Sequence, residues 1–579
     1  MSAFASRFRT AILAFVLFAT FPCFAFAGTD PCPRPVLGSA VKQPPDIYSQ
    51  NGVLLVTLNY YNTVDAWGRT LFCYVTPDGL ESPTLHVNPG DTIDLTLNNM
   101  ESGRPLGAGV ETVSAKSTLC GSFYMSPLTV NLHFHGLNVT PKCHGDNVVR
   151  TLVNPGESFE YKFTVPTDEP PGMYWYHQHV HGISSPAVQG GASGAIEVEG
   201  IANLQPAVAG LPQRFIVLRD QPLAYPPSNG NLSPSTPFWD VSINYVPISY
   251  PKYIPAVIKM QPGAQEFWRV VNAAADTVMD LVVLYDGKPQ PLQIVALDGV
   301  PTGSHDGHHK GTIITQNDIL IPTAGRAEFI VTGPSSNVKS AVLFTKKIDT
   351  GPAGDNDTAR PFAVIKTTHD TNEIPKAILP TGIPVQGQRF DGLSDSMVTA
   401  HRELYFSEAI HQDKKRPGAS GAFFITVEGQ SPVVYNANNP PAVVTTRGAV
   451  EDWVIENHAH EVHEFHMHQI HFQLLAVNGK PVPTEQRQFY DTYQVGYLPA
   501  GQNGPYPKIK VRMDFRGAVV GEFVYHCHIL DHEDQGMMAN IQVLPRGTAI
   551  PRAAGGGQRA GTQQSHSTKV GARGAAARA

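Results

Sequence analysis

The stretch Pro83-Thr-Leu-His-Val-Asn-Pro-Gly90, followed by Leu95 and Asn99, decides the fold because the chain contains versions of it three times. Pro255-Ala-Val-Ile-Lys-Met-Gln-Pro-Gly263 is followed by Trp268 and Asn272, and Pro441-Ala-Val-Val-Thr-Thr-Arg-Gly448 is followed by Trp453 and Asn457. Each copy has a glycine, four residues, a Leu or Trp, three residues and an asparagine. The copies lie about 170 to 185 residues apart, a spacing typical of whole domains. We therefore expect three similar domains.

Short segments between these copies are rich in β-branched and aromatic residues, and many end at Gly, Pro, Asn or Asp. They are 53–58, 92–97, 159–165, 214–218, 329–332 and 522–525. No long helical periodicity occurs. Several short strands in each repeat predict an all-β chain built of Greek-key sandwiches or barrels.

The repeat and the changes in composition predict the domain ranges. We expect a first domain at 28–205, a second at 206–375 and a third at 399–546, with a proline-containing linker at 376–398. Residues 547–579 are mostly Gly, Ala, Ser, Gln and Arg with almost no large apolar side chains, so a disordered tail is expected there.

The start of the chain matches an export signal. Arg7 and Arg9 precede the short apolar run 11–21, and Ala25-Phe26-Ala27 matches a small-residue cleavage site, so residues 1–27 are predicted to be a signal peptide. The run is shorter than the roughly 20 residues that a membrane-spanning helix needs. We expect a soluble, exported monomer, periplasmic or extracellular. Charged residues make up 16% of the chain and its formal net charge is −7, which argues against nucleic acid as a partner.

The six cysteines divide into three groups. Cys23 lies in the predicted signal, and Cys527 lies inside a histidine cluster. The other four are an even number in an oxidising compartment, so two disulfides are expected, with three possible pairings. They are Cys32, Cys73, Cys120 and Cys143.

Pairs of histidines separated by one residue are the strongest functional signal. Alternation along a strand puts residues i and i+2 on one face, roughly 7 Å apart at about 3.3 Å rise per residue, so both imidazoles reach one metal site. Four pairs occur in matching contexts, two in the first repeat and two in the third, at 133/135, 177/179, 466/468 and 526/528. The second repeat has neither pair. We expect these eight histidines to converge between the first and third domains, where eight neutral imidazoles suffice for three copper ions with positions left open for oxygen.

The third repeat adds a different ligand set. In His526-Cys527-His528 the cysteine points to the opposite face of the strand from its neighbours. His532 follows Cys527 by five residues and Met537 follows by five more, while His463 precedes the 466/468 pair by three. Two histidines, a cysteine thiolate and a weak axial methionine are the ligands of a blue-copper electron-transfer site. A zinc site would need more thiolates or an isolated set of three histidines.

In these four segments the chain resembles the three-domain multicopper oxidases, the family of laccases, ascorbate oxidase and bacterial metallo-oxidases. The resemblance extends over the mature chain to about residue 546. It implies three cupredoxin domains and an oxidoreductase that takes single electrons from a reducing substrate and reduces dioxygen to water. It also implies four copper ions, of which one is type 1, one is type 2 and two are type 3.

The resemblance assigns ligands to each ion. His463, Cys527, His532 and Met537 would hold the type 1 copper. His133 and His466 would hold the type 2 copper. One type 3 copper would take His135, His177 and His528, and the other would take His179, His468 and His526.

Two acids are candidates for proton delivery. The stretch from His532 to Met538 resembles the bacterial members, in which an acid directly after the type 1 histidine helps deliver protons to oxygen; here that acid is Glu533. A second acid follows the first His-x-His-Gly in the family, and Asp146 is the nearest match, after an apparent insertion at 140–144. Its alternative interpretation is a solvated loop carboxylate. Asp491 is interpreted as a residue near the substrate edge, or as a turn residue.

The reducing substrate stays open between a phenol or aromatic amine and a metal ion, cuprous or ferrous. The 11 methionines form no methionine-rich insert of the kind some cuprous-ion oxidases have, which favours organic substrates. A copper nitrite reductase resembles two domains with a three-histidine catalytic copper, whereas this chain has three repeats. A non-catalytic cupredoxin scaffold would lack ligands, and no ligand position is empty here. The remaining clustered histidines, 181, 458, 460, 471, 305, 308 and 309, are expected to lie beside ligands or in solvated loops.

Overall fold

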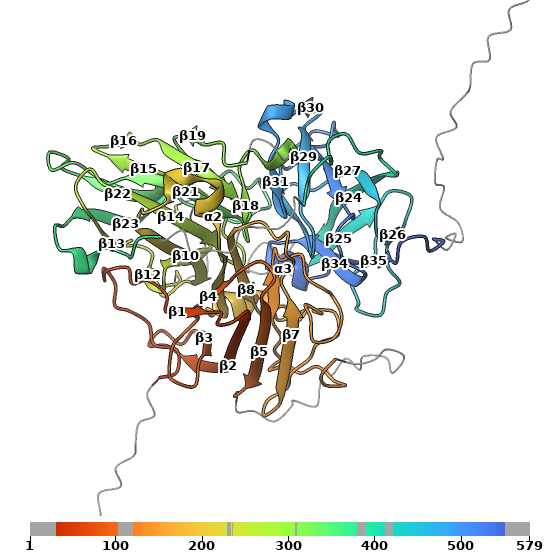
Figure 1. The fold of residues 1–579 in the computed structure, drawn as a ribbon, viewed down its shortest axis with the longest axis horizontal. Helices are drawn as coiled ribbons and strands as arrows, with labels where there is room; N and C mark the ends of the chain where they lie inside the picture. Colours follow the sequence, from red (N-terminus) through yellow and green to blue (C-terminus); the bar gives the residue numbers. More distant parts are fainter. Residues whose placement is uncertain are drawn as a thin grey trace, which may run out of the picture. The chain divides into compact units, whose positions relative to one another are not determined.

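The computed structural model describes residues 30–101, 120–227, 233, 235–306, 310–378, 389–410 and 421–550. The predicted signal peptide lies outside these ranges, as do most of the predicted linker and tail. Strands dominate the described residues, which confirms the predicted all-β class (Figure 1). No helix within those ranges is long and apolar enough to cross a membrane.

The first pair of sheets, red to orange in Figure 1, contains nine strands. One sheet runs in the order β1 (Asp46–Tyr48), β4 (Thr84–Val87), β9 (Ser193–Val198), β8 (Gly172–His177) and β6 (His133–His135). The other runs in the order β3 (Thr70–Val75), β2 (Val53–Val64), β5 (Thr92–Asn99) and β7 (Ser158–Thr164).

The second pair of sheets, yellow to green, has the same plan with extra short strands. One sheet is β12 (Val246–Ile248), β11 (Trp239–Ile243), β10 (Gln213–Pro222), β14 (Gln265–Asn272), β21 (Arg326–Thr332), β17 (Leu292–Leu297) and β18 (Val300–Pro301), with β19 (Ile314–Gln316) on β17. The other is β13 (Ala256–Met260), β23 (Arg360–Thr367), β22 (Ala341–Thr345), β15 (Met279–Tyr285) and β16 (Lys288–Pro289), with β20 (Ile319–Ile321) on β15.

The third pair, cyan to blue, completes the repeat. One sheet is β25 (Gly421–Val427), β24 (Ala400–Ile410), β27 (Val450–Asn457), β33 (Lys508–Asp514), β29 (Phe472–Val477) and β30 (Lys480–Pro481), with β31 (Phe489–Tyr490) on β29. The other is β26 (Val443–Thr446), β35 (Met538–Leu544), β34 (Gly521–Cys527), β28 (His463–Met467) and β32 (Thr492–Val495).

Equivalent strands pair identically in the three domains. In each, the strand that follows the repeated glycine lies parallel to an earlier strand, as β5 does to β2, β14 to β10 and β27 to β24. Its other neighbour is antiparallel, namely β7, β21 and β33. The strands that carry the histidine pairs are also equivalent: β6 pairs with β8, and β28 pairs with β34. Their counterparts in the second domain, β15 and β22, contain no histidine.

The repeated asparagine explains why the sequence motif recurs. Asn99, Asn272 and Asn457 each end their strand fully buried. In each case the side-chain oxygen accepts the backbone N–H two residues later, and the side-chain amide donates to backbone carbonyls of neighbouring loops. The residue therefore satisfies backbone groups that would otherwise be buried without partners, at the same corner of each domain.

Each domain has its own apolar core. β5 alternates between buried and half-buried positions, and Ile93, Leu95 and Leu97 point into the first core. Separate clusters of buried aliphatic and aromatic residues fill the second and third domains. Described strands occupy 46–198, 213–367 and 400–544; the finer domain boundaries stay predictions.

Within the described residues, helices are few and short. The α-helices are α1 (Ser184–Gln189), α2 (Ile201–Leu204) and α3 (Leu530–Asp534). The 3-10 helices are Pro206–Val208, Ser304–Asp306, Thr371–Glu373 and Thr484–Gln486. α1 and α3 lie on the connections that follow the histidine pairs at 177/179 and 526/528.

Two disulfides join the four cysteines that the sequence left unpaired. Cys32 bonds Cys73, and Cys120 bonds Cys143, with Cα atoms 5.7 and 5.4 Å apart. The second bond holds the insertion at 140–144 against the segment that leads into β6. Cys527 is free and buried.

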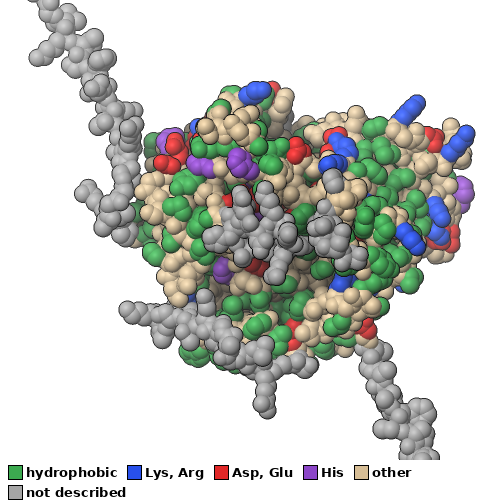
Figure 2. Space-filling model, turned by 180° about the vertical axis from the view of Figure 1, so that it is seen from behind, with side chains coloured by type: hydrophobic (Ala, Val, Ile, Leu, Met, Phe, Trp, Pro, Cys, Tyr) green, Lys and Arg blue, Asp and Glu red, His purple; other side chains and the backbone are tan. Residues whose placement is uncertain are grey.

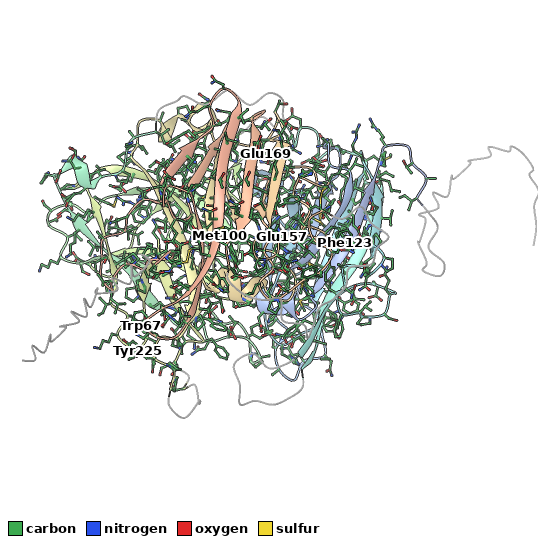
Figure 3. The ribbon with its side chains drawn as sticks, turned by 90° about the horizontal axis from the view of Figure 1, so that it is seen from below. Trp67, Met100, Phe123, Glu157, Glu169 and Tyr225 are labelled. Carbon is green, nitrogen blue, oxygen red and sulfur yellow. A yellow bond between two sulfur atoms is a disulfide. The ribbon has the colours of Figure 1, made fainter. Side chains whose placement is uncertain are left out.

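Aromatic and polar contacts join the first two domains. Trp67 and Tyr225, labelled side by side in Figure 3, meet edge to face with ring centroids 6.4 Å apart. Arg69 donates to the carbonyl of Pro222 at 3.0 Å. On the face drawn in Figure 2, Lys and Arg side chains stand singly or in small groups among apolar and neutral ones.

Candidate metal centres

The strands bring the eight paired histidines together, and every one is at most 1% exposed. In the first domain His133 lies opposite His177 in the β6–β8 register, and in the third His466 lies opposite His526 in the β28–β34 register. The two domains meet at these strands: the Nε2 atom of His526 lies 3.2 Å from that of His179 and 3.1 Å from that of His468. Three imidazole nitrogens from both domains thus converge on one point.

The unpaired ring nitrogens fit a metal cluster. The Nε2 atoms of His133, His177 and His466 and the Nδ1 atom of His135 are buried without a hydrogen-bond partner. Their other ring nitrogens are occupied: Nδ1 of His177 donates to the carbonyl of Gln178 at 2.8 Å, and Nδ1 of His466 donates to that of Asp491 at 2.9 Å. A metal-binding histidine has this pattern, one nitrogen fixed by the protein and one facing the ion.

Burial also keeps these rings neutral, as metal ligands must be. Desolvation, followed by the neighbouring imidazoles, lowers the pKa of His133, His135 and His468 well below the usual value. Sets of three ligand atoms lie within 4.8 Å of one another, including His179 with His468 and His526. The donor set therefore fits copper ions, which imidazole nitrogen binds well.

A second group of ligands lies on the other side of β34. The Nδ1 atoms of His463 and His532 are 3.1 Å apart, and the sulfur of Cys527 lies 3.6 and 3.8 Å from them. The backbone of Met537 adjoins this site, because its carbonyl accepts the N–H of Cys527 at 3.0 Å. Burial raises the pKa of the Cys527 thiol, so a bound cation would be needed to keep it as a thiolate.

Both candidate acids are buried beside the histidines. Asp146 lies 2.9 Å from Nδ1 of His133, accepts the N–H of Phe134 and accepts a bond from Gln469. Burial raises the pKa of Asp146 to about 7. It is 1% exposed, so the solvated-loop alternative is wrong.

Glu533 lies on α3 and is fully buried. Its two oxygens lie 3.6 Å from Nδ1 of His179 and 3.6 Å from Nδ1 of His526. Burial, followed by the nearby Asp534, raises the pKa of Glu533 well above its usual range. This shift favours the protonated form of Glu533 beside the cluster.

Sequence reasoning misplaced one residue and missed three. Asp491 does not lie at a substrate edge: it is fully buried and accepts a hydrogen bond from Nε2 of His135 at 3.2 Å. Arg326, Glu408 and Glu461 also contact this acid or the histidines. Glu461 could have been found, since it stands two residues before His463 on the approach to β28. Nothing in the sequence marks Arg326 or Glu408.

The other clustered histidines that the structure describes form hydrogen bonds or ring contacts beside the predicted ligands or in loops. His471 donates to the carbonyl of Asp298 at 2.8 Å, and His181 packs its ring against Tyr435. His458 contacts Glu456 and His460 contacts the carbonyl of Leu498. Residues 308 and 309 of the loop cluster lie outside the described residues.

Comparison with known proteins gives matches over most of the chain. Two family models, both described as multicopper oxidase, match residues 124–202 and 410–547. The iron transport multicopper oxidase FET3 of Gibberella zeae is 22% identical over 461 residues, 71% of this chain and 67% of that protein. The multicopper oxidase mco of Staphylococcus haemolyticus is 37% identical over 97 residues, so the chain matches only 20% of that protein's length.

A solved structure shows the same fold. The multicopper oxidase from Campylobacter jejuni, described as a metallo-oxidase, superposes with a TM-score of 0.60 at 22% identity, over 89% of this chain and 97% of that one. The two matched segments contain all four histidine pairs together with Cys527. The chain therefore contains multicopper oxidase domains at 124–202 and 410–547, and it has the fold of a solved multicopper oxidase.

Proposed function

We propose that this chain takes single electrons from a reducing substrate at the His463–Cys527–His532 site and passes them to the eight-histidine site, where four electrons reduce dioxygen to two waters. The observation that carries this proposal is the place of Cys527 between His526 and His528 at the end of β34. Copper bound by these residues would supply the one-electron redox chemistry and the open positions for oxygen.

The residues around Cys527 connect the two sites. Its sulfur faces His463 and His532, while its carbonyl accepts a hydrogen bond from Nδ1 of His526 at 2.9 Å. A short covalent path and this hydrogen bond both lead from the sulfur to the cluster. Glu533 and Asp146 are proposed as the catalytic acids that hold protons for the reduction of oxygen, because each lies against a cluster imidazole.

The finer features belong to the same proposal. We assign four copper ions: type 1 to His463, Cys527, His532 and Met537, type 2 to His133 and His466, and type 3 to the remaining six cluster histidines. We further propose three domains, at 28–205, 206–375 and 399–546. The chain would be exported to the periplasm or the medium.

Metal content and oxygen consumption test this function. We expect about four copper ions per chain, an intense blue colour and consumption of one dioxygen per four electrons without release of peroxide. Purified protein that binds zinc, or one copper at full occupancy, would contradict the proposal. Peroxide as the main product would contradict only the proposed four-electron reduction of dioxygen at the eight-histidine site.

Carboxylates at the electron-entry site favour a metal ion as the substrate. The outward nitrogens of the two predicted type 1 histidines both face glutamates: Nε2 of His463 lies 3.5 Å from Glu408, and Nε2 of His532 lies 3.4 Å from Glu461. A cavity beside His532 is also lined by Asp276 and Asp355. Burial, followed by the neighbouring Glu408, Asp355 and Asp531, raises the pKa of Glu461 to about 9.

The side chains that line this cavity favour some substrates over others. Its lining contains no methionine, cysteine, phenylalanine, tyrosine or tryptophan side chain. Oxygen ligands suit harder divalent ions, whereas thioether and thiolate suit Cu(I). We therefore favour Fe(II) or Mn(II) over Cu(I), and over the phenol or aromatic amine that remains the alternative.

Two glutamine variants test the substrate. Glu461→Gln and Glu408→Gln should lower kcat/KM for Fe(II) or Mn(II) about 10-fold or more, while oxidation of an aromatic diamine stays within about 2-fold, because only the metal ion needs carboxylate oxygens as ligands. Glu485→Gln, an exposed acid in the same domain, is the control. Equal losses for the metal ion and the diamine would exclude a dedicated cation site without contradicting the oxidase itself.

A further inference from the structure

The second domain contributes no predicted copper ligand, yet one of its side chains reaches the histidine cluster. Arg326 begins β21, and its side chain is fully buried. Its Nη1 and Nη2 atoms donate to the two oxygens of Asp491 in the third domain, the first at 2.8 Å. Nη1 also donates to the carbonyl of Ala324 and Nε to that of Met173. These bonds fix the guanidinium in one orientation as a bidentate clamp on the carboxylate.

Asp298, between β17 and β18 of the second domain, binds the backbone of Asp491 through its side chain. One carboxylate oxygen of Asp298 accepts the N–H groups of Asp491 and Thr492 at 3.1 and 3.3 Å, and the other accepts the N–H of Arg326 at 2.8 Å. The two second-domain residues therefore bind Asp491 from opposite ends. All three are almost completely buried.

Asp491 in turn contacts one imidazole from each half of the cluster. Its side chain accepts a hydrogen bond from Nε2 of His135, in the first domain. Its backbone carbonyl accepts one from Nδ1 of His466, in the third. The nitrogens left free, Nδ1 of His135 and Nε2 of His466, are buried and have no partner. Asp491 thus selects which nitrogen each ring presents to the cluster.

We propose that Arg326 and Asp298 are positioning residues for the trinuclear copper site, which act by clamping Asp491 and so fix the tautomers of His135 and His466. Without the guanidinium, Asp491 would be a buried carboxylate with no cation in contact, and its side chain would be free to rotate. His135 would then lose the acceptor that holds its Nε2–H. The second domain would thus supply residues that position the cluster histidines, although it supplies no predicted copper ligand.

Variants of both partners test the clamp. Arg326→Lys keeps a charge but loses the bidentate fork, Arg326→Met loses both, and Asp491→Asn keeps the shape. We expect retention of cluster copper against a chelator to fall about 10- to 100-fold in Arg326→Met and Asp491→Asn, with Arg326→Lys between them and the wild type. The electron paramagnetic resonance signal of type 2 copper should change in the same order, while the blue type 1 absorption stays.

A matched variant separates positioning from general stability. Arg269 on β14 is equally buried and forms ion pairs with Glu197 and Glu328, but it is hydrogen-bonded to none of the cluster histidines. Arg269→Lys should lower the Tm of the copper-free protein about as much as Arg326→Lys without changing the type 2 signal. An unchanged type 2 signal in Asp491→Asn, or the same change in Arg269→Lys, would overturn the proposal.

Discussion

Among the single residues, Glu533 has the surroundings that best suit a proton donor to oxygen. It has no charged partner that would hold it ionised; Ser184 donates to it at 3.4 Å, and cluster imidazoles lie on both sides. Burial raises its pKa well above the usual range, which favours the protonated acid. A group in this state can give a proton to reduced oxygen and be refilled through water.

Glu533→Gln should therefore slow reoxidation by dioxygen while leaving other steps intact. Glutamine keeps the shape and the hydrogen bonds but has no transferable proton, so we expect reoxidation about 10²- to 10⁴-fold slower. Copper content and the blue band should not change. Stopped-flow measurement of the two half-reactions is the check.

Glu522→Gln, on β34 but away from the cluster, serves as the control. If the Glu533 variant were reoxidised at the wild-type rate, protons would have to arrive by another group, with Asp146 the first candidate.

The predicted ligands illustrate what local sequence can and cannot give. A His-x-His pair can be found in the sequence because alternation on a strand is a local rule. The Arg326–Asp491 contact joins residues 165 positions apart, and no local pattern marks either residue. The cysteine pairing was open for the same reason, since four cysteines allow three connectivities.

Among the elements, β34 is the one on which the two sites depend. Its end places Cys527 opposite Phe465 of β28 and His526 opposite His466, so one register positions both ligand sets. A shift of this register by one residue would move the side chains of β34 to the opposite faces of the sheet. β34 itself was predicted correctly at 522–525, because this segment is rich in β-branched and aromatic residues and follows a glycine.

The short helices α1 and α3 were not predicted. They have six and five residues, too few for a helical period to be visible. α3 nonetheless carries His532 and Glu533, so the orientation of both side chains could not be predicted from these five residues.

Cys527→Ser tests β34 at the level of the element. The hydroxyl is similar in size and buried at the same place, so the fold should persist, with Tm of the copper-free protein lowered by at most a few degrees. The blue absorption should disappear and turnover should stop, because serine provides no thiolate. Absorption spectra, oxygen uptake and copper analysis measure this. A variant that stays blue would exclude Cys527 as the sulfur ligand.

At the scale of the whole molecule, the cluster joins the first and third domains through ionisable groups. Two of its histidines, His179 and His526, come from different domains and stand 3.2 Å apart. Each protonated ring there would be a buried charge facing others. The interface between the domains is therefore sensitive to protons whenever no metal occupies it.

Copper-free protein should accordingly lose stability as pH falls below about 6.5. Burial lowers the pKa of His526 and His463 to about 3 in the folded chain, while unfolded histidine titrates near 6.5. Between these values the unfolded state binds more protons, so the stabilisation is complete above pH 6.5 and is lost progressively towards pH 3. Each such histidine contributes up to about 1.4 kcal/mol per pH unit to the slope.

Thermal unfolding at pH 7.5 to 4.5 measures this dependence with and without copper. The copper-loaded protein should show a higher Tm and a flatter profile, since a metal-bound nitrogen cannot accept a proton until the ion leaves. Replacing two buried rings, as in His466→Asn with His468→Asn, should flatten the copper-free profile, whereas the exposed His401→Gln should not. An acid slope that is unchanged in the double variant would place the sensitivity outside the cluster, and the buried imidazoles between the two domains would then not be its cause.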